Sequence, residues 1–558
     1  MPTEMIFEPE RRVPIPATDV LTYLFADPKY DANKPLFVDV ANPSRNISYN
    51  QARTIIRQLI AGLRAWGVTE RDCVAIHSFN DIYYCMLVLA IVGCGGVFTG
   101  TNPAYTPHEI AHHFRASETR FVISEPEILS PILAAAKEVD IPESHIRIFD
   151  TMTSQTIPPG RVSWKELFNH GEADWVSFDD LEKAQSTAAA RLFSSGTTGL
   201  PKAATNTHRN LVAEQEVVYG VNPRGYEASR LIAIPLFHAA AAPSTHFGIL
   251  QAGHTTYMMR RFDLPTFLST VERYAITDLT LVPPIAIAIV MTDLTHSRPW
   301  LKSVRLAHCG AAPLDKDVQA RVQKLLAPGA RFTQVWGMTE TSCIGIMFPL
   351  AEDDGSGSVG RLVPNLEAKL INDAGENISA YDVRGELCVR GPTVTPGYYK
   401  NASANAESFD SGGWFHTGDI AYCARETKKW YIVDRKKELI KVRGFQVAPP
   451  ELEGVLLSHP GIADAAVIGV KDQTGGRDGE LPRAYVVRRG GGECEWAGLG
   501  EEEVKRHLAG RLAKYKALTG GVRFVDAIPK NASGKILKRV LREEAEREIT
   551  AAGSKGKL

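Results

Sequence analysis

The stretch SSGTTGLPK, Ser194 to Lys202, decides how this sequence is interpreted. Its two glycines let a ligand approach the backbone closely, and its Ser and Thr residues offer hydroxyl and amide donors. Lys202 adds a cation at the end of the stretch. An apolar lead-in, Ala188 to Phe193, and a helix-like segment after Asn206 place the stretch between a buried strand and a helix. We therefore predict a loop that holds the phosphates of a nucleotide triphosphate.

The stretch matches neither GxxxxGK[ST] nor GxGxxG, the two common phosphate-loop patterns, so it indicates phosphate binding without naming a family. A cluster of Ser, Thr and Gly is more often a surface turn, and that interpretation stays open for the stretch taken alone. The apolar residues before it and the cation at its end favour phosphate binding.

The composition excludes several classes of protein. A length of 558 residues predicts more than one domain, and 44% hydrophobic with 23% charged residues is typical of a soluble globular protein. A formal net charge of -1 argues against binding to nucleic acid or to acidic membranes. Eight scattered cysteines without a CxxC pair favour a reducing compartment. Any anionic ligand must therefore be bound by positively charged residues at its own site.

Targeting signals are weak in this sequence. The N-terminus lacks the apolar core of a secretory signal. The longest apolar stretch, around Cys85 to Phe98, is broken by glycines and is too short to span a bilayer, so we predict a buried helix that enters a turn. The final Gly556-Lys557-Leu558 resembles the Ser-Lys-Leu peroxisomal address with Gly in place of Ser, and a frayed basic tail is the alternative. We expect a cytoplasmic or peroxisomal protein.

Apolar runs alternate with helical patterns over most of the first 430 residues. This alternation predicts α/β layers with largely parallel sheets. After a loop near Glu352 to Gly360, short strands at Glu367 to Ile371 and Gly385 to Arg390 indicate a β-rich subdomain. The clearest apolar runs before that loop are Val74 to Ser78, Arg120 to Ser124, Leu231 to Pro235 and Asp278 to Val282.

A charge-dense segment that begins at Glu426 separates this region from a smaller one, with the boundary near Asp434. The smaller region has a mixed α/β pattern, and the apolar spacing of Ile536 to Ile549 is helical. Its other expected elements are a helix opening at Pro449, strands at Ala465 to Val470 and Arg483 to Val487, and a helix from Glu501 to Leu512.

Five further segments carry chemically active residues in a fixed order. Glu340 is a hard oxygen ligand suited to a Mg²⁺ ion that bridges phosphates. Asp419 can accept hydrogen bonds from two vicinal ribose hydroxyls, and Arg435 can donate to the same sugar. Lys535 lies in a Ser/Gly-rich loop, although each such charge taken singly is more often on the surface. The segments are PLFH (235–238), CGAAP (309–313), WGMTE (336–340), WFHTGD (414–419) with VDRKKELIKVRGFQVAP (433–449), and PKNASGKILKR (529–539).

With these segments in this order, the chain resembles the adenylate-forming (ANL) superfamily of acyl-CoA synthetases, luciferases and peptide-synthetase adenylation domains. It is most similar to the 4-coumarate-CoA-ligase-like group, and the resemblance covers nearly the whole chain. The resemblance implies an AMP-binding N-terminal domain at residues 1–433, built from two α/β sheets and a β-rich subdomain. A hinge at 434–437 and a small, mobile α+β C-terminal lid domain at 438–558 would follow. A place in secondary metabolism is also implied.

The resemblance also implies the residues of the nucleotide site. Trp336 would stack on adenine, at a position where most members carry Tyr, and Glu340 would bind Mg²⁺. Lys535 would contact the carboxylate and the α-phosphate during adenylation. The implied catalytic residues are Lys535, Lys441, His238, Thr339 and Glu340. The implied ATP and AMP contacts are Ser194, Ser195, Gly196, Thr197, Thr198, Gly199, Lys202, Gly310, Ala311, Ala312, Trp336, Gly337, Met338, Thr339, Asp419 and Arg435.

For thioester formation the resemblance implies Lys441, Gly444 and Gln446, brought to the site by rotation about Lys437. Coumarate ligases carry larger residues after the histidine of PLFH, including Tyr at the position of Ala240, so a coumarate pocket does not carry over. We expect an apolar aryl or medium-to-long-chain acid. The implied acyl pocket is His238, Ala239, Ala240, Ser244, Gly310 and Val335.

The expected activity is an ATP- and Mg²⁺-dependent acid-thiol ligase: carboxylate and ATP give acyl-AMP and pyrophosphate, and CoA then gives the thioester and AMP. One alternative is an acyl-AMP ligase that serves a carrier protein, although no carrier domain follows in this chain. A luciferase-like oxygenase and a non-catalytic nucleotide-binding regulator are two others. Retention of Lys202, Glu340, Asp419 and Lys535 together argues against the regulator. No nucleic acid and no integral membrane association are expected.

Overall fold

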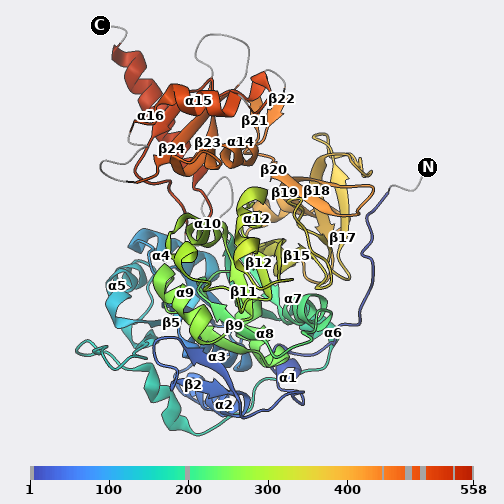
Figure 1. The fold of residues 1–558 in the computed structure, drawn as a ribbon. Helices are drawn as coiled ribbons and strands as arrows, with labels where there is room; N and C mark the ends of the chain where they lie inside the picture. The colour runs from blue at the N-terminus through green and yellow to red at the C-terminus, as the bar shows by residue number, and fades with distance from the viewer. Residues whose placement is uncertain are drawn as a thin grey trace.

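The computed structural model describes residues 5–194, 201–442, 445–471, 480–490, 498–509, 511–531 and 534–555. Figure 1 shows a large region, coloured blue to yellow, with a smaller orange and red domain on top of it. The helices of the large region are α1 (Val20–Leu24), α2 (Tyr49–Ala65), α3 (Ile82–Gly93), α4 (Pro107–Ser117), α5 (Leu129–Glu138), α6 (Leu181–Ser186), α7 (His208–Glu214), α8 (Gly248–Ala252), α9 (Leu264–Arg273), α10 (Pro283–Met291), α11 (Leu294–Ser297), α12 (Lys316–Leu325) and α13 (Ala402–Ser408).

The first sheet has six strands in the order β6-β5-β3-β4-β7-β8, all parallel except β8. Val74 and Ile76 face the core that contains α3, whereas Ala75 faces α4 and α5, because successive strand residues point to opposite faces. The strands are therefore buried on both faces, as expected from continuous apolar runs. Their bounds are β3 (Cys73–His77), β4 (Val97–Thr101), β5 (Thr119–Ser124), β6 (Ile146–Ile148), β7 (Ala188–Ser194) and β8 (Lys202–Thr207).

The second sheet has seven strands in the order β13-β12-β11-β9-β10-β1-β2, parallel except for β2. One hydrophobic core joins the two sheets, and α3 lies in it with all but one of its residues buried. The predicted α/β layers are thus confirmed. The bounds are β1 (Pro35–Asp39), β2 (Asn46–Ser48), β9 (Ser229–Ile232), β10 (Thr255–Met258), β11 (Asp278–Leu281), β12 (Leu306–Cys309) and β13 (Arg331–Gln334).

The β-rich subdomain contains an antiparallel sheet in the order β17-β18-β19-β20 and a smaller one in the order β14-β15-β16. The predicted strands at 367–371 and 385–390 are β17 and β18. The bounds are β14 (Trp336–Met338), β15 (Cys343–Met347), β16 (Arg361–Leu362), β17 (Glu367–Ile371), β18 (Gly385–Arg390), β19 (Phe415–Cys423) and β20 (Trp430–Arg435).

The small domain is built on the hairpin of β23 and β24, with β25 parallel to β24. Ala465 and Val467 of β23 pack with α14 and α15 on one face, and Ala466 and Ile468 pack with α16 on the other. The expected mixed α/β pattern is confirmed. The bounds are β21 (Ile440–Val442), β22 (Phe445–Val447), α14 (Pro449–Leu457), β23 (Ile462–Lys471), β24 (Glu480–Arg488), α15 (Glu501–Ala509), β25 (Val522–Phe524) and α16 (Lys538–Lys555).

One local expectation needs correction. The phosphate-loop stretch connects β7 to β8 in an antiparallel hairpin, with Ser194 paired to Lys202, so it does not lie between a strand and a helix. The residues of β8 are small or polar and hide its strand character, and α7 begins only at His208. The buried helix that enters a turn is confirmed as α3 and the turn after Gly93, and the end of the same apolar stretch, Val97 and Phe98, continues into β4.

The cysteines and helices add two findings. All seven described cysteines are free and buried, and Cys494 lies outside the described residues. Within the described parts of the chain, no helix is both long and apolar enough to cross a membrane. The residues 556–558 of the suspected targeting signal are also outside the described part.

Candidate active site

The carboxyl ends of parallel strands in the second sheet converge at one edge, where ligands of open α/β sheets commonly bind. Gly310 follows β12 and Val335 follows β13, and the Val335 amide donates to the Cys309 carbonyl at 2.9 Å. A Cβ atom at Gly310 would lie only 2.8 Å from Cγ2 of Val335. The fold therefore brings together these two residues of the predicted acyl pocket. Ala311 and Ala312 follow directly, and Ala311 is exposed.

Trp336, Asp419 and Arg435 form a connected group beside this edge. The indole Nε1 of Trp336 donates to Oδ2 of Asp419 at 2.7 Å, and Nε of Arg435 lies 2.7 Å from Oδ1. Asp419 and Arg435 are paired residues of β19 and β20. The charge of Asp419 raises the pKa of Arg435. The sequence predicted each of these residues separately, but it did not predict the hydrogen bond between the tryptophan and the aspartate.

Glu340 is held by a tyrosine that sequence reasoning missed. The hydroxyl of Tyr398 donates to Oε1 of Glu340 at 2.7 Å, and Nζ of Lys202 lies 5.0 Å from the centre of the tyrosine ring. Oε2 of Glu340 is buried and has no hydrogen-bond partner among the described residues. A carboxylate with one unengaged oxygen fits Mg²⁺, which binds proteins through one or two carboxylates and takes its other ligands from phosphates and water.

Other parts of the WGMTE segment are shaped by close packing. A Cβ atom at Gly337 would lie 1.5 Å from the carbonyl oxygen of Cys343, so only glycine fits there. The Met338 amide donates a hydrogen bond to Oγ1 of Thr341 at 3.0 Å. Thr339 is buried in the turn that follows. The sequence predicts a buried loop for Trp336-Gly337-Met338, but these residues form strand β14, with Trp336 buried and the next two residues partly buried.

His238 lies in the turn after β9. Its Nδ1 accepts a hydrogen bond from the Ala240 amide at 3.1 Å, so Nε2 carries the proton of the neutral ring. Burial, and then the charge of Lys535, lower the pKa of His238 to about 4. Its imidazole is therefore neutral at pH 7. Ala239, Ala241 and Ala242 are buried behind it.

The small domain places Lys535 near these groups. Gly534, at φ +81°, approaches α10 so closely that a Cβ atom would lie 2.3 Å from Cγ of Pro284. The Lys535 amide donates to Oδ1 of Asn531 at 2.8 Å, which fixes the loop. Burial, and then the charge of Arg435, lower the pKa of Lys535. The contact of Gly534 with Pro284 thus places the loop that carries Lys535 against α10 of the large region.

A buried charge cluster lies at the junction of the two domains. Nζ of Lys538, on the first turn of α16, is 3.2 Å from Oε1 of Glu453 and 3.6 Å from Oε2 of Glu438. Asp434 is buried, and burial raises its pKa to about 7. This cluster anchors the helix that follows the Lys535 loop, and in the sequence it is visible only as a run of charges.

Two of the residues expected for thioester formation, Lys441 and Gln446, lie on the hairpin of β21 and β22. Lys441 is exposed on β21, and its amide donates to Oε2 of Glu480 at 3.0 Å within the small domain. It is the strand partner of Gln446. Figure 1 shows β21 and β22 at the outer side of that domain. Lys437 is exposed in the turn between β20 and β21. The structure therefore separates the lysine of β21 from the group around Lys535.

Several predicted residues lie outside the described part of the chain. They are Ser195, Gly196, Thr197, Thr198, Gly199 and Gly444. Ser194 and Lys202, which frame the phosphate-loop stretch, are described and partly exposed.

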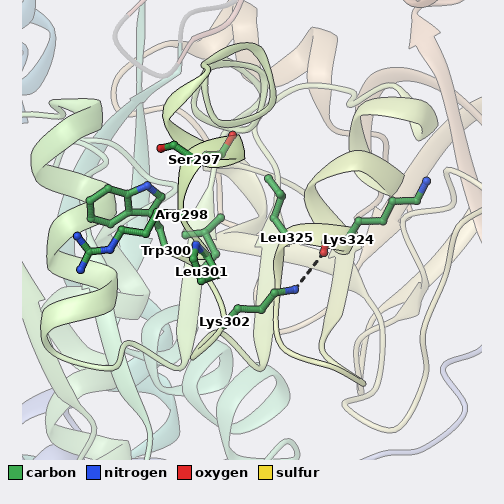
Figure 2. A pocket seen from close by; sticks show the side chains of 9 residues that line it. Ser297, Arg298, Trp300, Leu301, Lys302, Lys324 and Leu325 are labelled. Atoms are coloured by element: carbon green, nitrogen blue, oxygen red, sulfur yellow. Dashed lines mark hydrogen bonds between the residues drawn. The ribbon is translucent and has the colours of Figure 1, made fainter.

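A surface cavity of about 260 Å³ lies near α11 and the end of α12. Figure 2 shows Trp300, Lys302 and Lys324 among its lining side chains, and Nζ of Lys302 donates to the Lys324 carbonyl at 3.2 Å. None of its lining residues is among the predicted site residues, so this cavity is distinct from the strand edge described above.

The fold and the site define a nucleotide-binding α/β enzyme whose small domain brings a lysine to the ends of parallel strands. Residues 25–399 match the AMP-binding enzyme family, and residues 451–535 match the C-terminal domain of AMP-binding enzymes. The chain belongs to the AMP-binding enzyme family, and within it is an adenylate-forming acyl-CoA ligase.

Similar proteins span the whole chain. A phenylacetyl-CoA ligase of Aspergillus niger is 53% identical over 98% of this chain and 100% of its own length. An acyl-CoA ligase of Aspergillus niger is 52% identical over 96% of this chain and 100% of its own length. Among solved structures, ATP-bound MatB from Rhodopseudomonas palustris superposes with a TM-score of 0.80 at 27% identity, over 95% of this chain and 99% of that one.

Proposed function

We propose that this enzyme converts an apolar aryl or medium-to-long-chain carboxylic acid to its CoA thioester, with the residues around Trp336 and Lys535 as the adenylation site. The ligase class follows from the family, and the phenylacetyl-CoA ligase of Aspergillus niger favours an arylacetic acid as the first candidate. The single observation that carries the site assignment is the packing of the Lys535 loop on α10, where a Cβ atom at Gly534 would lie 2.3 Å from Cγ of Pro284.

The nucleotide would be held by the group around Asp419. Each carboxylate oxygen has two lone pairs, so Asp419 can bind Trp336 and Arg435 and still accept from two ribose hydroxyls. The indole would thereby be fixed for stacking on adenine. Lys202 and the residues of the phosphate-loop stretch would cover the β- and γ-phosphates.

Glu340 would hold the Mg²⁺ ion, with Tyr398 fixing its other oxygen. The ion supplies charge neutralisation for the phosphates when it is bound. Lys202, whose Nζ lies 5.0 Å from the centre of the Tyr398 ring, would add a second positive charge close to them.

Lys535 would neutralise the carboxylate and the α-phosphate as they approach one another. Two anions repel, so a preorganised cation in a water-poor site lowers the barrier to attack. The neutral imidazole of His238 would donate a hydrogen bond from Nε2–H to the carboxylate of the acid. Because the ring carries no positive charge, it would leave the carboxylate's charge to Lys535. No side-chain nucleophile is needed.

The acyl group would lie along the small residues that follow His238. Ala239 is buried and Ala240 is partly exposed, which leaves space where a larger side chain would fill it. Val335 and Gly310 would form the opposite wall. Ser244 would offer the substrate an acceptor only, because its hydroxyl proton is donated to the Ala241 carbonyl at 3.0 Å.

Thioester formation would use a second arrangement of the small domain, residues 438–558, turned about the hinge at 434–437. Rotation at Lys437 would replace the Lys535 loop by Lys441, Gly444 and Gln446, and Gly444 would leave room for the pantetheine arm. Transfer to a carrier protein is the second candidate acceptor. We also propose a cytoplasmic or peroxisomal location and a role in secondary metabolism.

The test is a screen of carboxylic acids for pyrophosphate release, with and without CoA and with and without Mg²⁺. Arylacetic acids are expected to release pyrophosphate with Mg²⁺ and to yield a CoA thioester when CoA is added. Acyl-AMP that accumulates with every acid and never passes to CoA would favour the carrier-protein acceptor. Preference for short, charged acids would contradict the proposed substrate class.

A further inference from the structure

Glu214 is a buried carboxylate that none of the roles above uses. It is the last residue of α7, and 0% of its surface is exposed. Oε1 accepts a hydrogen bond from the Ile344 amide at 3.1 Å. Oε2 has no hydrogen-bond partner among the described residues, although it is fully buried. Buried polar groups are nearly always satisfied, so an unengaged oxygen in such a place calls for an explanation.

Glu214 lies behind the segment that we assign to the acyl group. Its partner Ile344 follows Cys343, whose Sγ is 3.8 Å from the Ala240 carbonyl. The next residue, Gln215, donates from Nε2 to the Pro243 carbonyl at 3.1 Å. Glu214 thus lies between β15, which its Oε1 contacts, and the residues after His238, which its neighbour Gln215 contacts.

The backbone around Glu214 is irregular in a way that is typical of binding sites. Residues 215–220, directly after α7, form a π-helical turn, and residues 243–247 form a second one. The two turns are in contact with each other. Wider π-helical turns inside helices occur most often at functional sites, because they redirect side chains and backbone groups.

The electrostatic surroundings of the Glu214 carboxyl favour an uncharged ligand group as its hydrogen-bond partner. Burial raises the pKa of Glu214 well above its usual value, and the hydrogen bond from Ile344 lowers it only in part. No cation among the described residues contacts the carboxylate. A carboxylic acid in this state offers one O–H donor and a free acceptor, which matches a hydroxyl group.

We propose that Glu214 binds a hydroxyl group at the end of the substrate remote from its carboxylate, so that the preferred acid is a hydroxyl-bearing aryl or acyl acid. This inference rests on the proposed function, because it assumes that the acyl group follows the residues after His238. It narrows the substrate from an apolar acid to an apolar acid with one polar terminus.

The experiment compares the best acid of the pyrophosphate screen with its terminally hydroxylated counterpart. Wild-type enzyme is expected to show at least about a tenfold higher kcat/KM for the hydroxylated acid, since a buried polar group that is left unpaired is costly. Equal or lower kcat/KM for the hydroxylated acid overturns the inference without any variant. A different result, no pyrophosphate release with any apolar acid, would contradict the proposed function itself.

Variants add a second readout. In Glu214→Leu the preference for the hydroxylated acid should disappear, mainly through a higher KM, whereas Glu214→Gln keeps an acceptor for Ile344 and a donor for the substrate and should retain most of it. Glu216→Gln is the matched control, because that carboxylate accepts from the Tyr23 hydroxyl at 2.9 Å. An unchanged preference in folded Glu214→Leu contradicts the assignment.

Discussion

Trp336 and Asp419 are joined by a hydrogen bond of 2.7 Å between the indole Nε1 and Oδ2, although 83 residues separate them in the chain. The bond links β14 to β19 of the β-rich subdomain. The proposed adenine platform and the proposed ribose acceptor are therefore joined by a direct hydrogen bond. This coupling gives the first prediction.

Replacing Trp336 by Phe keeps an aromatic ring but removes the donor to Asp419. The carboxylate would lose a fixed orientation, so we expect KM for ATP to rise about tenfold with a smaller change in kcat. Trp66→Phe is the control, because it also removes an indole hydrogen bond, to the Ser144 carbonyl at 2.8 Å. A KM for ATP that does not change in Trp336→Phe would contradict the coupling.

Lys535→Ala should separate the two half-reactions. Without the cation near the α-phosphate, pyrophosphate exchange should fall about a hundredfold to a thousandfold. Capture of supplied acyl-AMP by CoA should be spared, because in the proposed cycle that step would use the other arrangement of the small domain. Lys530→Ala, which removes an ion pair of 2.6 Å with Asp464 beside the same loop, is the control. Equal loss of both half-reactions would count against the role of Lys535.

Gly444→Trp should have the opposite effect. A large side chain would obstruct the pantetheine arm, so thioester formation from supplied acyl-AMP should fall while pyrophosphate exchange persists. The two activities are measured separately on the same preparation. Unchanged thioester formation would show that the arm takes another path.

Asp434 should make stability depend on pH. Burial raises its pKa to about 7, above the usual aspartate value near 4, so the folded protein binds the extra proton between these two pH values. The stabilisation is complete below about pH 4 and is lost as the pH rises through about 7. We expect Tm to fall between pH 5.5 and pH 8, measured by thermal unfolding.

Asp434→Asn should weaken that fall in Tm, because the amide does not titrate. Asp373→Asn is the control. Asp373 forms an exposed ion pair of 3.1 Å with Lys436, which lies two residues after Asp434 in the chain. If the Tm of the wild-type protein and the Tm of Asp434→Asn fall by the same amount between pH 5.5 and pH 8, the Asp434 carboxyl does not titrate as described.

The sequence predicted the architecture well where local patterns are strong. Strands β17 and β18 and helix α14 begin at the expected residues. Turn residues precede the two strands, and the sequence Pro-Pro-Glu marks the start of the helix. Strand β8 was missed, since its small and polar residues follow no clear alternation. The family resemblance supplied the nucleotide-site residues that local patterns alone would have left as surface charges.

The site's connections were harder to predict than its members. Tyr398 reaches Glu340 from a segment 58 residues away, and only the tertiary fold brings them together. Glu214 sits in an ordinary helical sequence, where an acidic residue is normally solvated. A sequence shows which groups are present, but not which of their hydrogen-bonding atoms are left without a partner.

Gly534 lies against Pro284 so closely that one added carbon would collide with the proline ring. In the proposed cycle this contact between the small domain and α10 would have to open before the small domain could turn, so a substitution at Gly534 would alter the closed arrangement without touching a substrate.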